Sequence, residues 1–157
     1  MLRDERESVT VRCAHPHDDA RALSALCGQL GYPRSAGSIA SALASMLPEG
    51  GGERALMLAE RAGTIVGWIE VERRVGILHD GDEAEITGLV VAEDSRSMGV
   101  GAALLAEAER WAMRGGMTTM VVRSNVIRVR AHEFYFTRGY AETKRQAVFR
   151  KSLTGTM

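Results

Sequence analysis

An apolar stretch that runs into a glycine-containing turn and then into an amphipathic helix most constrains how this chain folds. The composition predicts a strand over 84–92, and apolar residues recur at helical spacing over 99–113. So short a connection directs free backbone N–H groups and the positive end of the helix to one place. Gly99 and Gly101 let a ligand approach the backbone closely. The segment therefore predicts an anion-binding turn.

Two well-known phosphate-binding turns do not fit this segment. A P-loop requires Gly-Lys-Ser or Gly-Lys-Thr after the glycines, and the chain has neither there. The dinucleotide fingerprint requires a small residue three positions after the second glycine, where Leu104 stands. That fingerprint also belongs to the first strand–helix unit, whereas this turn lies past the middle of the chain. The bound anion is therefore expected to be of another kind.

The remaining elements follow from periodicity and from turn residues. A hairpin is predicted at Ala62-Gly63. Further strands are predicted over 9–13, 55–59, 64–72, 118–123 and 143–151, and helices from about 16 to 30, from Ser35 or Ser38 to 47, and over 128–138. Early strands are adjacent and later strands alternate with helices. This order predicts an α/β fold, a mixed sheet with helices on both faces.

Length and charge limit the classes of protein that remain. The chain has 157 residues, 45% of them hydrophobic and 25% charged, which predicts a single domain over 1–157 with a flexible tail at 1–8. Lys plus Arg and Asp plus Glu both total 20, so the net charge is zero. A chain-wide basic footprint is absent, and no nucleic-acid partner is expected.

Cysteine use and hydropathy predict the compartment. Cys13 and Cys27 form no disulfide framework, which favours a reducing environment. The charged start lacks the apolar run of a signal peptide, and no stretch approaches roughly 18 consecutive apolar residues. A cytoplasmic protein without membrane attachment is expected. His132-Glu133 would need a second histidine at 136, where Phe136 stands, so no metal is predicted.

The turn and a downstream signature together resemble the GNAT family of N-acetyltransferases. The turn reads Arg96-Ser-Met-Gly99-Val-Gly101, and Asn125, Ala131-His-Glu-Phe-Tyr135 and Gly139-Tyr140 follow it. The resemblance extends from about residue 9 to about residue 153. Residues 128–140 are similar to the small-amine branch, which includes aminoalkylphosphonate and aminoglycoside acetyltransferases. Ser97 departs from the glycine of many members, but its N–H can still donate.

The resemblance implies a fold and a set of cofactor-binding residues. The fold is the GNAT acyl-CoA N-acyltransferase fold, with a central six- to seven-stranded mixed sheet. Acetyl-CoA would lie between the strand that ends near Val91 and the strand that ends near Asn125. Its pantetheine arm would pair with the backbone like an added strand, and N–H groups of the turn would hold its pyrophosphate. The implied binding residues are Leu89, Val90, Val91, Arg96, Ser97, Met98, Gly99, Val100, Gly101, Ala102 and Asn125.

The chemistry of amine acetylation assigns two catalytic candidates. An ammonium group must lose a proton, and Glu85, eleven residues before Arg96, stands where many such enzymes place a glutamate base. The departing thiolate needs a hydrogen bond, which the family implies for Tyr135. A strand N–H near Leu89 or Val90 would serve the oxyanion. Direct transfer in a ternary complex is expected, without an acyl-enzyme.

Each assignment has a structural alternative. Arg96 and Glu85 also suit solvated positions, Tyr135 suits a core position, and Asn125 suits a strand-end turn. His79 fits an acceptor pocket or a plain loop. Basic residues late in the chain are candidates for the 3′-phosphate of CoA, with no choice among them: Arg123, Arg128, Arg130, Arg138, Lys144 and Arg145.

The expected acceptor is a primary amine of a small molecule. A cationic acceptor would suit the acidic residues near 70–83, which are Glu70, Glu72, Asp80, Asp82 and Glu83. Two rival functions stay open, a protein N-terminal or lysine acetyltransferase and a non-catalytic acetyl-CoA-binding module. Dimers are common in the family, and pairing of the last strand across a homodimer also stays open.

Overall fold

A computed structural model describes residues 8–15, 19–47, 52–78 and 81–155. It divides into two compact units, residues 1–123 and 124–157, and each unit is described by itself. The first unit carries the sheet and three α-helices. The second carries one helix and an extended C-terminal segment.

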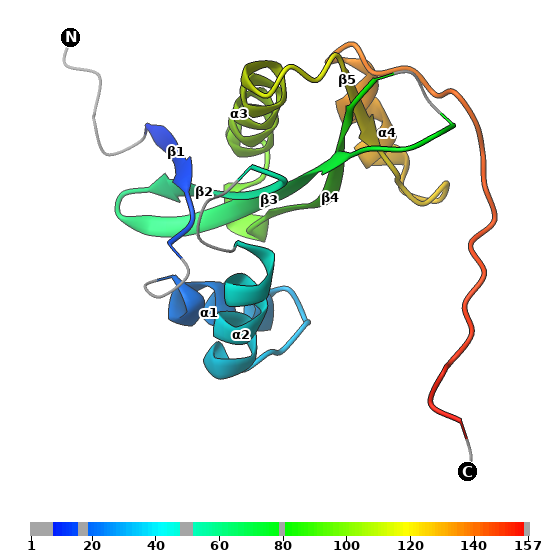
Figure 1. Cartoon of the computed structure of the whole chain (residues 1–157). Coiled ribbons are helices and arrows are strands. Elements are labelled where there is room, and N and C mark those ends of the chain that lie inside the picture. The colour runs from blue at the N-terminus through cyan, green and yellow to red at the C-terminus, as the bar shows by residue number, and fades with distance from the viewer. Residues whose placement is uncertain (1–7, 16–18, 48–51, 79–80, 156–157) are drawn as a thin grey trace, which may run out of the picture. The chain divides into compact units, whose positions relative to one another are not determined.

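The first unit is built on a five-stranded mixed sheet in the order β1-β2-β3-β4-β5 (Figure 1). Neighbours from β1 to β4 pair antiparallel, and β4 pairs with β5 in parallel. A parallel pair needs a crossover connection, which a helix supplies here. The strands are β1 (Val9–Cys13), β2 (Arg54–Arg61), β3 (Thr64–Arg74), β4 (Glu83–Val91) and β5 (Thr119–Val122).

Helices cover both faces of this sheet, as predicted. On one face lie α1 (Ala20–Gln29) and α2 (Ala36–Met46), and on the other lies α3 (Val100–Arg114) (Figure 1). Side chains alternate along a strand, so Leu56 and Leu58 of β2 join the apolar cluster of α1 and α2. Gly67 of β3 lies under α3, because a Cβ there would be 3.3 Å from the side chains of Val100 and Leu104.

Local interactions explain the predicted start of α2 and the predicted hairpin. The hydroxyl of Ser35 accepts a hydrogen bond from the N–H of Ser38 at 3.0 Å and so caps α2, which decides between the two predicted caps. The predicted hairpin at Ala62-Gly63 joins β2 to β3, with φ of 49° and 75° at these residues. Such positive values are those of a tight hairpin turn.

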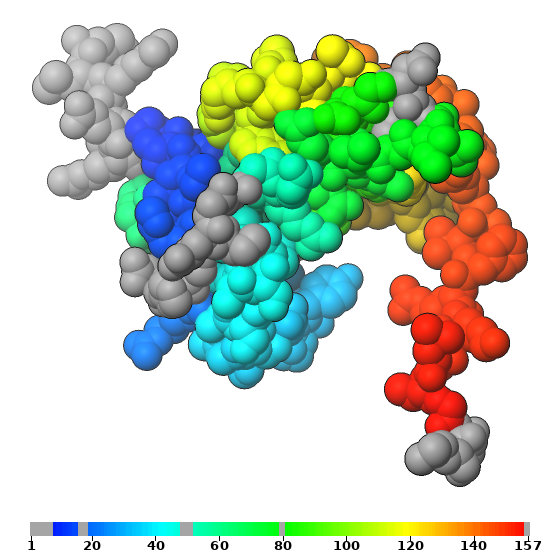
Figure 2. All heavy atoms as spheres, in the orientation of Figure 1, coloured from blue at the N-terminus to red at the C-terminus, as the bar shows by residue number. Residues whose placement is uncertain are grey.

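The second unit corrects the predicted strand count. It contains α4 (Val129–Phe136), and no regular structure is found over 141–155. The strand predicted over 143–151 is wrong, and the described sheet has five strands rather than six to seven. Alternating apolar and polar residues favour a strand only where the edge of a neighbouring strand is available for pairing. The side chains of Val148 and Phe149 are instead 87% and 93% exposed along a narrow extended segment (Figure 2, orange to red).

A helix that crosses a bilayer needs about 20 predominantly apolar residues. In the parts of the chain that the structure covers, no helix is both long enough and apolar enough to do so.

Candidate functional site

The parallel strands β4 and β5 stay together for only part of the length of β4. They pair from Glu83 with Thr119 to Ile86 with Val122. Beyond Ile86, β4 continues to Val91 while β3 remains paired along its other edge. Within the described residues, the backbone groups of 87–91 that point away from β3 therefore have no strand partner. An extended ligand with amide groups can add to such an edge like a strand.

A β-bulge marks the place where this free edge begins. On β3, Glu70 pairs with Gly88 and the next residue, Val71, pairs with Ile86, so Thr87 is an extra residue in β4. A bulge bends its strand and increases the local twist. The bulge lies immediately after the last pair that joins β4 to β5.

The predicted turn connects the free edge to α3. A short 3-10 helix at Glu93–Ser95 is followed by four turn residues, 96–99, all of them exposed. Ser97 and Gly99 have φ of 67° and 80°, and the first helical hydrogen bond runs from the N–H of Ala103 to the carbonyl of Gly99 at 3.0 Å. No side chain caps α3, and its first turn has no acidic residue. The first N–H groups of the helix are thus available to an external anion.

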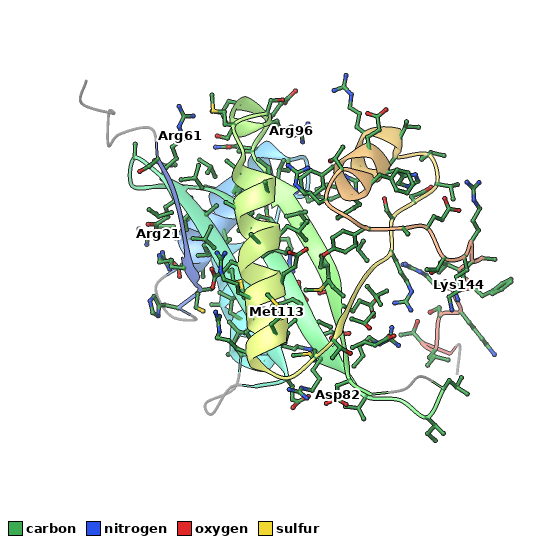
Figure 3. The ribbon with its side chains drawn as sticks, turned by 90° about the horizontal axis from the view of Figure 1, so that it is seen from above. Arg21, Arg61, Asp82, Arg96, Met113 and Lys144 are labelled. Atoms are coloured by element: carbon green, nitrogen blue, oxygen red, sulfur yellow. The ribbon has the colours of Figure 1, made fainter. Side chains whose placement is uncertain are left out.

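Two arginines lie beside this turn (Figure 3). The Nε of Arg96 donates to the carbonyl of Val91 at 3.4 Å, and the Nη1 of Arg61 contacts the Sδ of Met98 at 2.7 Å. In the described residues neither guanidinium has a carboxylate partner. Arg61 was missed by sequence reasoning, because only the strand pairing brings the end of β2 next to residue 98. Both cations lie near the positive end of the helix, where a bound anion would be stabilised.

Glu85 lies at the centre of an ion-pair cluster. The residue is 8% exposed, and its two carboxylate oxygens accept hydrogen bonds from Nη1 of Arg74 and Nη1 of Arg123. By strand register these side chains share the sheet face opposite α3. The solvated alternative for Glu85 is wrong. Sequence reasoning also missed both arginine partners, since they come from β3 and from the end of β5.

The acidic residues that suggested a cationic acceptor are partly neutralised. Glu72 forms an ion pair with Arg54 at 2.9 Å, and Asp82 forms one with Arg73, which also donates to the carbonyl of Gly115 at 2.6 Å. Glu70 and Glu83 make no ion pair within the described chain. Asp80 and His79 lie outside the described residues.

The second unit holds the other two predicted residues. Tyr135 of α4 packs edge-on against Phe134 and also contacts Tyr140, with ring centroids 5.2 and 5.6 Å away. Burial raises the pKa of the Tyr135 phenol, which stays protonated at neutral pH. Asn125 forms a turn in which its Oδ1 accepts from the N–H of Ile127 at 3.2 Å, as its structural alternative predicts. That contact leaves the NH₂ of its amide available.

Taken unit by unit, the structure brings most of the predicted residues together. Leu89, Val90 and Val91 lie on the free edge of β4, and Arg96 to Ala102 follow in the turn and the first helical residues. Glu85 lies on the same strand, before the bulge. In the described part of the chain, no three His, Cys, Asp or Glu side chains gather as metal ligands would.

The sequence matches the model of the acetyltransferase (GNAT) family over residues 25–140. It is 35% identical over 86 residues to an aminoalkylphosphonate N-acetyltransferase of Salmonella typhimurium, and that alignment covers 55% of this chain and 56% of the relative. It is 26% identical over 94 residues to an aminoglycoside N(6')-acetyltransferase type 1 of Serratia marcescens, covering 58% of this chain and 64% of that protein. The matches thus span less than two thirds of either relative.

The fold is similar to that of a solved structure of AAC(6')-Iy in complex with the bisubstrate analogue CoA-S-monomethyl-acetylneamine. The TM-score is 0.79 at 18% identity, and the superposition covers 92% of this chain and 99% of the other. At this level of identity the likeness concerns the fold alone.

Proposed function

The chain belongs to the acetyltransferase (GNAT) family, and from this premise we propose that it transfers an acetyl group from acetyl-CoA to a primary amine of a small molecule. One observation carries the proposal. The edge of β4 is free from the bulge to Val91, and it leads directly into an uncapped turn at the start of α3. An edge for amide groups followed by an anion site matches the order of pantetheine and pyrophosphate in CoA.

The residues of the first unit fit this ligand. Backbone groups of Leu89, Val90 and Val91 would pair with the amides of the pantetheine arm. The N–H groups from Ser97 to Ala102 would donate to the pyrophosphate, with the side chain of Arg96 beside them. For Asn125 we propose that the free NH₂ of its amide donates to the pantetheine arm. Acetyl-CoA is thus a substrate that supplies the thioester, and no metal is required.

The transfer itself requires one proton to leave the acceptor and one to reach the thiolate. The ammonium group first gives up a proton, for which we propose Glu85, through a water molecule. The amine nitrogen then bonds to the acetyl carbon while the carbon–sulfur bond breaks. The electron pair of that bond stays on sulfur, which Tyr135 would stabilise by donating a hydrogen bond from its protonated phenol. The acetyl group passes directly between the two substrates in a ternary complex.

The names of the relatives support a small acceptor. One is an aminoalkylphosphonate N-acetyltransferase and the other an aminoglycoside acetyltransferase, so both names describe small molecules that carry an amine. These two acceptors differ in charge, since an aminoalkylphosphonate carries an anionic group and an aminoglycoside is a polycation.

The test measures release of free CoA thiol with a panel of small amines, aminoglycosides, aminophosphonates and short peptides. Tyr135→Phe is run in parallel, with acetyl-CoA affinity measured by calorimetry. We expect turnover with one class of small amine, and we expect the variant to lose turnover while keeping acetyl-CoA affinity. Turnover of peptides alone would replace the proposal with a protein acetyltransferase. Tight binding without any turnover would indicate a non-catalytic binder.

A further inference from the structure

We propose that Arg74 and Arg123 together bind an oxyanion group of the acceptor, a phosphonate, phosphate or carboxylate, and that Glu85 holds the two guanidinium groups in position. This inference rests on the proposed function, because it assigns the chemical class of the acceptor. We call Arg74, Glu85 and Arg123 the arginine clamp. The acceptor that fits it is a small zwitterion with an amine at one end and an oxyanion at the other.

The geometry of the clamp sets each guanidinium in place. Nη1 of each arginine donates a hydrogen bond to a different carboxylate oxygen of Glu85, whose side chain is 10% exposed. The arginine side chains are 40% and 51% exposed, and in the described residues their other N–H groups have no partner. A guanidinium carries several N–H donors in a rigid plane, so one contact leaves the rest of the fork for a ligand.

The donors of the clamp exceed what Glu85 needs. Two guanidinium groups on one carboxylate give Arg74, Glu85 and Arg123 together a formal charge of +1, while Glu83, opposite Arg74 in the strand register, and Glu70 add carboxylates on the same face that have no ion pair in the described residues. A carboxylate is costly to bury and is compensated by one well-placed arginine, so the second is not needed for neutrality. Planar guanidinium forks match the oxygens of phosphonate and carboxylate groups and bind them through paired hydrogen bonds. The surplus donors therefore point to an external oxyanion.

The clamp lies where β4 and β5 separate. Arg123 directly follows Val122, the residue at which β5 leaves β4, and Glu85 precedes the bulge on β4. An oxyanion held there lies at the start of the gap whose free edge is assigned to the pantetheine arm. Glu83 and Glu72 share this sheet face, and Glu72 is neutralised by Arg54. Glu83 has no ion pair in the described chain and suits the ammonium end of a zwitterion.

The test compares acceptors that differ in charge. Aminoethylphosphonate and β-alanine carry an oxyanion, ethylamine has the amine alone, and spermidine is a polycation. The variants are Arg74→Gln and Arg123→Gln. Arg110→Gln is the matched control, because Arg110 is a similarly exposed arginine, ion-paired to Glu107 on α3. Circular dichroism and thermal unfolding verify that each variant is folded.

Each clamp variant loses charge-assisted hydrogen bonds that contribute to the binding free energy of an oxyanion acceptor. We therefore expect the KM for the oxyanion acceptors to rise by roughly 10- to 100-fold in each variant. The KM for acetyl-CoA should stay within about twofold, the KM for ethylamine should rise much less than that for the oxyanion acceptors, and the control should match the wild type. A preference for phosphonate over carboxylate identifies which oxyanion the clamp accepts. An equal loss with all four amines, or wild-type turnover confined to spermidine, would overturn the inference.

A binding measurement keeps this inference separate from the proposed function. Phosphonoacetate is titrated by calorimetry into the wild type and into Arg123→Gln, without acetyl-CoA or turnover. Binding that the variant loses supports the clamp even if no amine is acetylated. Binding that is absent or unchanged in the variant overturns the clamp, whereas a failure to bind acetyl-CoA would overturn the proposed function alone.

Discussion

Arg123 and Glu85 form an ion pair that joins the end of β5 to β4 at the point where the two strands separate. Because Glu85 is buried and also pairs with Arg74, three strands are tied together by one carboxylate. The same carboxylate is our candidate for the proton acceptor. Its two roles, base and anchor of the arginine clamp, predict different kinetics.

Glu85→Gln separates these roles. Loss of a general base lowers kcat by roughly 10²- to 10⁴-fold. Loss of an anchor alone raises the KM for the acceptor while kcat is largely kept. We expect both changes, measured by steady-state kinetics across pH. Glu107→Gln, which removes an ion-paired carboxylate from α3, is the control, and an unchanged kcat in Glu85→Gln would reject the base.

Arg61→Ala tests whether the arginine beside Met98 contributes to anion binding at the turn. The lost cation should weaken acetyl-CoA binding by about fivefold at low salt, and by less at high salt because exposed charges are screened. Calorimetry at two salt concentrations measures both effects. Arg21→Ala removes an exposed arginine from α1 and should change nothing. Equal affinities of wild type and Arg61→Ala would assign Arg61 a purely structural contact.

Gly67→Ala tests the close packing of α3 on the sheet. A Cβ at this position would lie 2.6 Å from the carbonyl oxygen of Val90. Relief of this clash requires a shift of the backbone of β4, which costs more free energy than the movement of a flexible side chain. Overpacking of this kind lowers the free energy of unfolding by about 1–3 kcal/mol. Gly28→Ala in α1 has nothing within 4 Å and should be neutral or slightly stabilising. Urea denaturation measures both, and equal stability of the two variants would contradict the proposed clash.

Asp19→Asn tests a buried carboxylate that ties β1 to the start of α1. Side-chain hydrogen bonds from Arg12 at 2.8 and 3.0 Å lower the pKa of Asp19, and the N–H of His15 adds to the effect. A lowered pKa in the folded state stabilises the protein above the unfolded-state value near 4, and this stability is lost as pH falls through the folded pKa. We expect the variant to lose about 2–3 kcal/mol near neutral pH.

The pH dependence provides the decisive comparison for Asp19. The difference between wild type and variant should be constant near neutral pH and should shrink once the pH falls below about 4 and through the lowered pKa of Asp19, because the carboxylate then becomes protonated. Urea denaturation at several pH values measures it. Glu142→Gln removes an exposed carboxylate that pairs with Arg145, and its stability should follow the wild type. A difference for Asp19→Asn that stays constant with pH would show that charge is not the cause.

The fold was predictable where a local sequence pattern is compatible with only one secondary structure. The strand over 84–92, the turn and the helix after Gly99 follow from periodicity and glycine placement, and β4, the turn and α3 confirm them. The strand predicted over 143–151 was wrong. Alternating apolar and polar residues are compatible with a strand, but they do not show that a partner strand is present. The assigned roles of Glu85, Tyr135 and Asn125 stay predictions.

The candidate site was less predictable because contacts across strands have no sequence period. Arg74 lies eleven residues before Glu85 and Arg123 lies thirty-eight after it, and only the register of β3, β4 and β5 brings them together. Arg61 at the end of β2 and Met98 in the turn are likewise 37 residues apart in the sequence and meet only in the folded chain. A basic residue at a strand end gives no indication of its partner, so the arginine clamp required the structure.

The extra residue at Thr87 has a consequence for how a ligand associates with the protein. Because the bulge is built into a strand that is paired with β3, the bend of β4 is fixed by the sheet itself. A ligand laid along 87–91 therefore meets backbone groups already fixed by β3, and little ordering entropy is lost on the protein side. Under the proposed function, recognition of the thioester arm would then be closer to docking on a rigid template than to an induced fit.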